Sequence, residues 1–325
     1  MIISKTPLRI SFVGGGTDYK GFYKTHQGAV VSTSIDKYIY ISVNKKFDNK
    51  IRVSYSKTEN VDKVSEIEHP LVREALKMTK IDGGLEITSI ADIPSSGTGL
   101  GSSSSFLVGL LNALYAYKGI HVPRERLAKE ACKIEIDLLK EPVGKQDQYI
   151  ASYGGLEYIL FNPNETVFVN PIICKEKTKQ SLQKNLLLLY TGITRRANTV
   201  LKEQNHTIKE SNKQRILIEM AKLAEKLQLS LVKNDLDSFG ALLHQNWLLK
   251  KQLAERISSP EIDSWYDIGL KNGALGGKIL GAGGGGFLLF YANPSSQVKI
   301  KKALNNLKAL DFAFEPQGSQ IIYVG

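Results

Sequence analysis

The sequence predicts an α+β fold with two lobes. Strand-like and helix-like segments alternate along its 325 residues, and no internal repeat is visible. A long helical stretch separates the strands of the first part from those of the last part. The length is sufficient for two domains with large cores, and we place them at residues 1–182 and 183–325.

Strands dominate the first part, where β-branched and aromatic residues run together or alternate with polar ones. Apolar residues at helical spacing then predict helices over residues 103–117 and 123–139, and Pro123 suits the start of a helix. The strands predicted in this part are residues 8–13, 28–32, 37–46, 51–55, 85–89 and 156–161.

The second part is expected to open with the apolar strand 186–190. Residues 197–273 read as helical throughout, with breaks near 234–235 and 258–260, where turn-forming residues gather. The elements expected after them are a strand at 287–291, a helix near 295–308, and strands at 312–316 and 319–324.

Residues 94–105 (PSSGTGLGSSSS) form a loop of glycine and serine directly before the helix 103–117. Glycines let the main chain approach a ligand closely, and the unpaired N–H groups at a helix start attract anions. Serine hydroxyls add hydrogen-bond donors or a metal ligand. A flexible linker has a similar composition, but a linker rarely runs straight into a helix. The segment therefore predicts a phosphate-binding loop.

Two further glycine clusters lie at residues 14–16 and 276–286. Residues 281–286 match the G-x-G-x-x-G spacing of dinucleotide-binding loops, but that motif joins a strand to a helix, whereas a strand follows here. The Walker A signature of P-loop NTPases is absent from the sequence. The phosphate chemistry is therefore expected on a different fold.

The composition is ordinary for a soluble globular protein, with 42% hydrophobic and 23% charged residues. No apolar run approaches the roughly 18 residues that cross a bilayer, and the N-terminal residues lack a signal-peptide layout. Cys132 and Cys174 are expected to be reduced thiols, and the five histidines lack metal-ligand spacing. We therefore expect a cytoplasmic protein without a membrane partner.

The net charge of +11 raises the question of nucleic-acid binding. Basic residues are spread through both parts of the chain, with no basic tail and no interleaving of aromatic and basic residues. Solubility and the attraction of anionic substrates explain such a diffuse charge. The sequence thus favours small-molecule substrates and no nucleic-acid partner.

Four elements, in this order, resemble the superfamily of galactokinase, homoserine kinase, mevalonate kinase and phosphomevalonate kinase, the GHMP kinases. They are residues 7–18 (PLRISFVGGGTD), the 94–105 loop with its GLGSS string, 135–148, and 278–286 (KILGAGGGG). The resemblance spans nearly the whole chain. It implies a two-lobed fold, with a ribosomal-S5-domain-2-like N-terminal domain and a ferredoxin-like C-terminal domain. It also implies a kinase that uses ATP and Mg²⁺.

Within this superfamily, residues 8–18, 144–149 and 190–196 are similar to the D-glycero-D-manno-heptose 7-phosphate kinases. Galactokinases carry Glu-His where this chain has Gly15 and Gly16. The similarity implies phosphorylation of the anomeric C1 hydroxyl of the sugar phosphate. The product would be a 1,7-bisphosphate used for nucleotide-activated heptose and cell-surface polysaccharide.

Two alternatives stay open. One is a kinase of a neutral sugar of the fucose or galactose type, and the other is a non-catalytic sensor of sugar phosphate and ATP with the same fold. A degenerate kinase is expected to lose at least one of Ser103, Glu135 and Asp147, and this chain retains all three. Catalysis is therefore the preferred interpretation.

The resemblance implies catalytic roles for Asp147 and Arg9. Asp147 would accept or orient the proton of the attacking hydroxyl, while Arg9 would steady Asp147 or the transferred phosphoryl group. Ser103 and Glu135 would bind Mg²⁺, which prefers oxygen ligands and keeps several waters. Without the resemblance, Asp147 reads as a turn aspartate, Arg9 as a surface arginine on a strand, and Glu135 as a solvated helix carboxylate. The ATP phosphates would be held by Gly97, Thr98, Gly99, Leu100, Gly101, Ser102, Ser103 and Ser104.

Asp18 would bind sugar hydroxyls, although it could also cap a short helix. Arg195 and Arg196 follow the strand 186–190, and their guanidinium groups could bind the 7-phosphate. A solvated helix start explains the arginine pair about equally well. Lys145 is a further candidate for the phosphate or for tuning the charge of Asp147. The other residues expected at the acceptor are Gly15, Gly16, Thr17 and Gly283.

Overall fold

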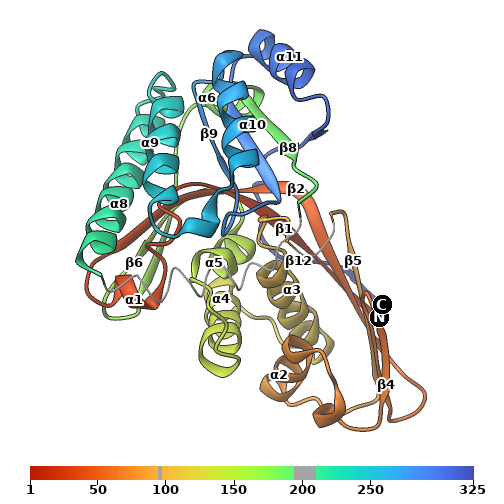
Figure 1. The fold of residues 1–325 in the computed structure, drawn as a ribbon. Helices are drawn as coiled ribbons and strands as arrows, with labels where there is room; N and C mark the ends of the chain where they lie inside the picture. Colours follow the sequence, from red (N-terminus) through yellow and green to blue (C-terminus); the bar gives the residue numbers. More distant parts are fainter. Residues whose placement is uncertain (94–96, 194–209) are drawn as a thin grey trace.

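The computed structural model of the protein describes residues 1–93, 97–193 and 210–325. These residues form an eight-stranded sheet and a four-stranded sheet, with helices against both faces of the larger sheet (Figure 1). This arrangement confirms the predicted α+β fold with two lobes. None of the helices in the described ranges is long and apolar enough to span a membrane.

The larger sheet has the strand order β12-β1-β2-β5-β3-β4, and β6 and β7 continue it from β2. Neighbouring strands are antiparallel except for the parallel pair β3 and β5. The strands are β1 (Ile2–Val13), β2 (Gly28–Lys45), β3 (Ile51–Ser54), β4 (Thr58–Val61), β5 (Leu85–Ala91), β6 (Leu156–Phe161), β7 (Val167–Pro171) and β12 (Gln320–Val324).

The long strand β2 is the spine of this sheet. One edge pairs with β1, while the other pairs with β6 over residues 28–33 and with β5 over residues 39–45. The sequence predicted two strands here, because polar residues interrupt the apolar pattern around Ser32. Those polar residues are buried, and the Ser32 hydroxyl donates to the carbonyl of Ile10 at 3.0 Å, so the strand continues through them.

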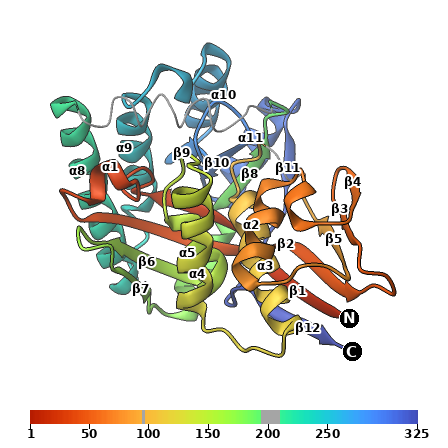
Figure 2. The ribbon, with the colours of Figure 1, turned by 90° about the horizontal axis from the view of Figure 1, so that it is seen from below.

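A layer of helices covers one face of the larger sheet, and Figure 2 shows it from below. Its central member, α3 (Ser102–Tyr117), packs against β1 and β2 and contacts the helices around it. The helix predicted over 123–139 is α4 (Arg124–Cys132) continued by the π-helical turn η2 (Lys133–Leu138). The remaining short elements of this part are α1 (Lys20–Tyr23), η1 (Val64–Glu66), α2 (Pro70–Thr79) and α5 (Gln146–Tyr153).

The second sheet has the antiparallel order β11-β8-β10-β9 and lies beyond the other face of the large sheet (Figure 1). On that face α8 packs against β1, β2 and β6, and α9 packs against α8 and β9. The elements of this part are α6 (Glu176–Lys184), β8 (Leu186–Tyr190), α8 (Ser211–Val232), α9 (Phe239–Lys251), η3 (Glu255–Ile257), α10 (Pro260–Lys271), β9 (Gly276–Ile279), β10 (Phe287–Tyr291), α11 (Pro294–Ala303) and β11 (Lys308–Leu310).

Two expectations for the last part are wrong. The helix near 295–308 ends at Ala303, and residues 308–310 instead pair with β8. The strand over 312–316 is reduced to a single bridge between Phe314 and Ile35. Side chains occupy the backbone donors that a strand would need: Asp36 accepts from Ala313 N at 2.8 Å and Gln183 from Phe314 N at 2.9 Å.

The last strand, β12, returns to the larger sheet and pairs with β1. Both views therefore show the two marked ends of the chain side by side (Figures 1 and 2). The division into residues 1–182 and 183–325 stays a prediction, and the sheets follow it except for β12.

Candidate active site

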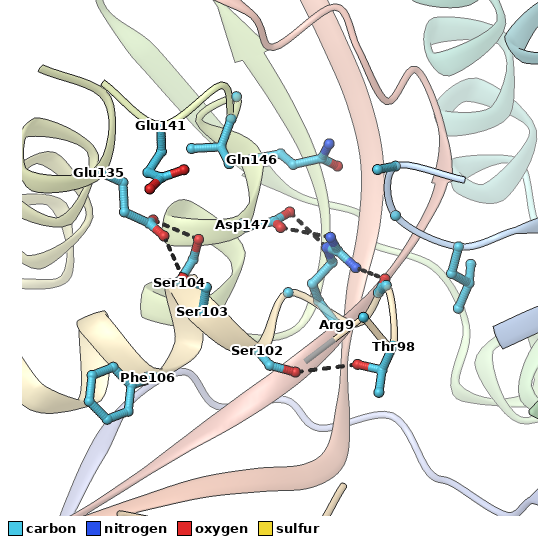
Figure 3. A pocket seen from close by; sticks show the side chains of 18 of the residues that line it. Arg9, Thr98, Ser102, Ser103, Ser104, Phe106, Glu135, Glu141, Gln146 and Asp147 are labelled. Carbon is cyan, nitrogen blue, oxygen red and sulfur yellow. Dashed lines mark hydrogen bonds and ion pairs between the residues drawn. The ribbon is translucent and has the colours of Figure 1, made fainter. Parts of the chain in front are cut away.

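A cavity of about 670 Å³ lies where β1, the loop before α3, η2, α5, α9 and β9 converge. Figure 3 shows part of its lining, with Phe106 at one end and Arg9 and Asp147 toward the other. The end around Phe106 is largely apolar and includes Ile39, Tyr55 and Leu71. The opposite end carries charged and polar groups, so the cavity suits a ligand with an apolar ring and a polar, anionic part.

The predicted phosphate loop borders this cavity. Gly97, Gly99 and Gly101 all have positive φ angles, of 72°, 76° and 78°, a conformation that glycine adopts most readily. Gly101 is the N-cap residue of α3, so the next three residues present first-turn N–H groups that have no partner within the helix. Such a helix start attracts anions. Within the predicted set, Leu100 is buried and does not line the cavity.

The glycine motif at residues 278–286, the third glycine motif of the chain, packs directly on this loop. A Cβ placed on Gly99 would lie 2.4 Å from the carbonyl oxygen of Leu280, and one on Gly286 would lie 2.4 Å from that of Thr98. Gly283 lines the cavity, and a Cβ there would lie 2.7 Å from the carbonyl oxygen of Ile257. The glycines of both motifs are therefore required by close backbone contact.

Arg9 and Asp147 form a bidentate ion pair beside the phosphate loop. Arg9 Nε donates to Asp147 Oδ1 and Nη2 donates to Oδ2, each at 2.7 Å. Arg9 Nη1 donates to the carbonyl of Gly99, and the Arg9 side chain is almost fully buried. Asp147 lies in the first turn of α5 and lines the cavity. The geometry thus joins a carboxylate, a cation and the phosphate loop in one place (Figure 3).

Glu135 is buried at the start of α3, on the π-helical turn η2. Its carboxylate accepts from Ser103 Oγ at 2.9 Å, from Ser104 Oγ at 2.7 Å and from the side-chain amide of Gln148. Burial raises the pKa of Glu135, while these hydrogen bonds oppose the rise. Figure 3 places Glu141 beside it.

Ser103 and Glu135 present one hydroxyl and one carboxylate side by side, which fits the predicted pair of Mg²⁺ ligands. The described residues contain no cluster of three or more His, Cys, Asp or Glu side chains that could hold a metal by themselves. An ion here would thus take its other ligands from water and from a phosphate-bearing substrate, as Mg²⁺ commonly does.

Asp18 lies in a second polar cluster at the charged end of the cavity. Its carboxylate accepts from Gly16 N at 2.9 Å, and from the backbone N and side-chain amide of Gln146, each at 3.2 Å. Burial raises the pKa of Asp18, the hydrogen bond from Gly16 opposes this, and the negative charge of Asp147 adds to the rise. Gly15, Gly16 and Gln146 also line this end.

The other residues expected at the acceptor have different outcomes. Thr17 is fully buried and its hydroxyl lies 2.9 Å from the carbonyl oxygens of both Gly14 and Ala29, to either of which it can donate, so it supports the loop without lining the cavity. Lys145 turns away from Asp147: it pairs with Glu165 and lies 4.4 Å from the ring centroid of Tyr23. Arg195 and Arg196 lie outside the described residues.

Two buried lysines at this end of the cavity were not predicted. Lys278, on β9, donates to the carbonyls of Ser11 and Phe12 at 2.8 and 3.1 Å. Lys250, on α9, donates to the carbonyl of Gly15 at 3.1 Å. Burial lowers the pKa of both amines, to about 8 for Lys250. A signal for Lys250 existed, because it continues the buried helical spacing of Leu243 and Trp247.

His69 also lines the cavity, which its sequence context did not indicate. Its ring stacks on Phe106, with centroids 5.1 Å apart, and contacts the edge of Tyr55. Its Nδ1 has no hydrogen-bond partner among the described residues. This aromatic group gives the apolar end of the cavity a surface on which a planar ring can stack.

Comparison with known proteins matches two parts of the chain to domain models of the same family. A model of the GHMP kinases N terminal domain matches residues 68–155, and a model of the GHMP kinases C terminal domain matches residues 223–309. The matched ranges contain the phosphate loop, Glu135 and Asp147 in the first case, and Lys250 and the third glycine motif in the second.

Named relatives span the whole chain. The D-glycero-alpha-D-manno-heptose 7-phosphate kinase of Campylobacter jejuni is 30% identical, with 98% of this chain and 97% of that protein covered. A galactokinase of Pyrococcus furiosus is 26% identical, with 93% of this chain and 92% of that protein covered. A solved D-glycero-D-manno-heptose 1-phosphate kinase from Bacteroides thetaiotaomicron shares the fold, with a TM-score of 0.81 at 24% identity and 100% of both chains covered.

Proposed function

This chain belongs to the GHMP kinases, and on that premise we propose that it phosphorylates the C1 hydroxyl of D-glycero-D-manno-heptose 7-phosphate with ATP. The product is the 1,7-bisphosphate, which serves the synthesis of nucleotide-activated heptose for cell-surface polysaccharide. The relative with the highest identity among those compared above is a heptose 7-phosphate kinase by name, and it aligns over nearly all of the chain.

The observation that carries the proposal is the bidentate pair of Arg9 and Asp147 beside the phosphate loop. The Arg9 guanidinium contacts both Asp147 and the carbonyl of Gly99, so it links the acceptor side to the loop that would hold the γ-phosphate. Phosphoryl transfer depends mainly on positioning and on stabilising the charge of the transferred group. This arrangement supplies both.

Asp147 is proposed to orient the attacking hydroxyl. Each of its carboxylate oxygens already accepts one charge-assisted hydrogen bond from Arg9, and a second lone pair on each oxygen remains for the substrate. An anomeric hydroxyl is more acidic than an ordinary alcohol, so Asp147 needs to accept its proton only late in the transfer.

The nucleotide is proposed to lie along the cavity, with its base at the apolar end near His69 and its phosphates on residues 97–104. Ser103 and Glu135 are the proposed Mg²⁺ ligands, and the ion would neutralise charge on the nucleotide phosphates. The chain itself then contributes the first-turn N–H groups of α3, the hydroxyls of the loop and the Arg9 cation.

The acceptor is proposed to bind at Gly15, Gly16, Asp18 and Gly283, with Arg195 and Arg196 reaching its phosphate. An ionised Asp18 can accept hydrogen bonds from neighbouring sugar hydroxyls. Domains 1–182 and 183–325 then contribute the catalytic pair and part of the acceptor site, respectively. We infer a cytoplasmic enzyme that acts on small molecules.

The test is a screen of the purified protein with ATP, Mg²⁺ and a panel of sugars, with ADP release as the readout. The panel contains heptose 7-phosphate, unphosphorylated heptose, fucose and galactose, and phosphorus NMR locates the new phosphate. We expect heptose 7-phosphate to be the best acceptor and to gain phosphate at C1. A better neutral acceptor would support the fucose or galactose alternative, and binding without turnover would support a sensor.

A further inference from the structure

The charged end of the cavity contains a cation that the proposed mechanism does not use. Lys250 is 5% exposed, lines the cavity and donates to the carbonyl of Gly15 at 3.1 Å. It comes from α9, which belongs to the part of the chain that packs on the second sheet. Its ammonium group therefore reaches the loop at residues 14–16 from the opposite lobe.

A line of contacts leads from the reacting end of the cavity to this cation. Gln146 precedes Asp147, and both its backbone and its side-chain N–H groups donate to Asp18. Asp18 in turn accepts from Gly16 N at 2.9 Å, next to the Gly15 carbonyl that Lys250 contacts. An acceptor whose hydroxyl meets Asp147 can thus extend past Asp18 toward Lys250.

Gly15 and Gly16 place no side chain of their own beside Lys250. A Cβ on Gly15 would lie 3.5 Å from Ser11 Oγ and 3.6 Å from Gln146 Nε2, and one on Gly16 would lie 3.4 Å from Leu217 Cδ2 and 3.5 Å from Lys250 Nζ. Larger side chains at these two positions would therefore occupy the space between the loop and Lys250. Their absence lengthens the acceptor site in the direction of the cation.

Two buried polar side-chain atoms in this region are unsatisfied within the described part of the chain. Ser11 Oγ and Gln146 Oε1 are buried, belong to residues that line the cavity, and have no hydrogen-bond partner among the described residues. Buried polar groups are nearly always hydrogen-bonded in native structures. A polyhydroxylated ligand lying between Asp147 and Lys250 would satisfy both.

We propose that Lys250 binds the phosphate that the acceptor carries at the end opposite to its reacting hydroxyl, and thereby selects a phosphorylated sugar over a neutral one. This inference rests on the proposed kinase function and names a specificity residue for it. An ammonium group attracts phosphate as a point charge, and exclusion of water strengthens the attraction.

The local charges support this role. The Asp18 carboxylate is covered by three N–H donors, which reduces its repulsion of a bound phosphate. Lys278 lies near enough that the charges of Lys250 and Arg9 add to the lowering of its pKa by burial. With a pKa of about 8, Lys250 remains mostly protonated at pH 7.

The adjacent residue on α9 provides a matched control. Lys251 points elsewhere: it forms an ion pair with Asp263 at 3.0 Å and does not line the cavity. The experiment measures kcat and KM with ATP for D-glycero-D-manno-heptose 7-phosphate and for unphosphorylated heptose. It compares the wild type with Lys250→Met, Lys250→Gln and Lys251→Met.

We expect the wild type to prefer the phosphorylated sugar. In Lys250→Met and Lys250→Gln the ratio of the two kcat/KM values should fall at least about tenfold, the usual scale for one charge-assisted contact, mainly through a higher KM for the phosphorylated sugar. Lys251→Met should keep the wild-type ratio. A second measurement needs no catalysis: heptose 7-phosphate without ATP should raise the Tm of the wild type clearly more than that of Lys250→Met.

The outcomes separate this inference from the proposed function. If the wild type prefers heptose 7-phosphate and both Lys250 variants keep that preference and the Tm shift, the inference is wrong while the function stands. The same holds if only an Arg195→Ala/Arg196→Ala double variant loses the preference. If the wild type prefers a neutral sugar, the sugar-phosphate function and this inference fail together.

Discussion

Gly99 and Gly281 lie so close together that a Cβ on Gly281 would come within 2.6 Å of Gly99 Cα. The phosphate loop and the third glycine motif are therefore in direct backbone contact, although they come from different parts of the chain. Any side chain at this point must push the two loops apart.

The first prediction follows from that contact. Gly281→Ala should raise the KM for ATP about tenfold or more, because displacing the loop by a few tenths of an ångström spoils the alignment of its N–H groups. Gly119→Ala is the control: Gly119 has a φ of 72°, close to the 70° of Gly281, but nothing lies within 4 Å of its Cβ position. Both variants place alanine at a positive φ, which costs about 1 kcal/mol in each. Equal KM values in the two variants would contradict the contact.

The second prediction concerns Asp147. Asp147→Asn keeps the shape of the side chain but removes the charge that pairs with Arg9 and meets the acceptor. We expect kcat to fall roughly 10²-fold or more, with little change in ATP affinity. Asp137→Asn provides a surface control, since Asp137 is half exposed and pairs only loosely with Lys20 at 3.5 Å. Near-normal turnover in Asp147→Asn would make this residue structural.

The third prediction concerns the metal. Ser103→Ala and Glu135→Gln should each raise the Mg²⁺ concentration at half-maximal activity, by about tenfold or more. Ser105→Ala is the control, because the Ser105 hydroxyl donates to the carbonyl of Pro7 and does not contact Glu135. The measurement is activity against Mg²⁺ at saturating nucleotide. An unchanged midpoint in both ligand variants would remove them from the metal site.

The fourth prediction concerns the pH dependence of stability. Glu157, on β6, is buried, and burial raises its pKa to about 7 while the charge of Arg124 opposes the rise. A carboxyl whose pKa is higher in the folded state favours the fold as long as it is protonated. This contribution is complete below the pKa of the unfolded state and is lost as the pH rises through about 7.

Glu157→Gln removes this titration and keeps the shape of the side chain. Its free energy of unfolding should exceed that of the wild type above pH 7, by up to about 3 kcal/mol, and the difference should shrink toward pH 4. Denaturant titrations at several pH values provide the measurement. A difference that does not depend on pH would show that Glu157 is ionised in the fold at neutral pH.

The sequence predicted those parts of the site that short motifs encode. Residues 97–99 and 101–104 of the phosphate loop line the cavity, as do Arg9, Asp18, Glu135 and Asp147. Asp18 follows the glycine turn at residues 14–16 and Asp147 lies in the first turn of α5, where local backbone geometry limits the residue types. Thr17 and Leu100 lie in the same motifs but face the core, because a motif fixes spacing and not the direction of every side chain.

The remaining features depend on contacts between distant segments. Lys250 reads as an ordinary helix lysine until α9 packs against the loop at Gly15. Residues 312–316 show alternating aromatic residues typical of a strand, yet Asp36 and Gln183 take their backbone donors. No local pattern could indicate those partners, since each comes from a remote part of the chain.

The Lys278 contact also constrains how the molecule can flex. Its amine joins β9 to the end of β1 through two carbonyls in a buried setting. Separating the lobes there would leave a buried donor and two acceptors unpaired, at a cost of several kcal/mol. The contact therefore resists separation of the two lobes at the charged end of the cavity.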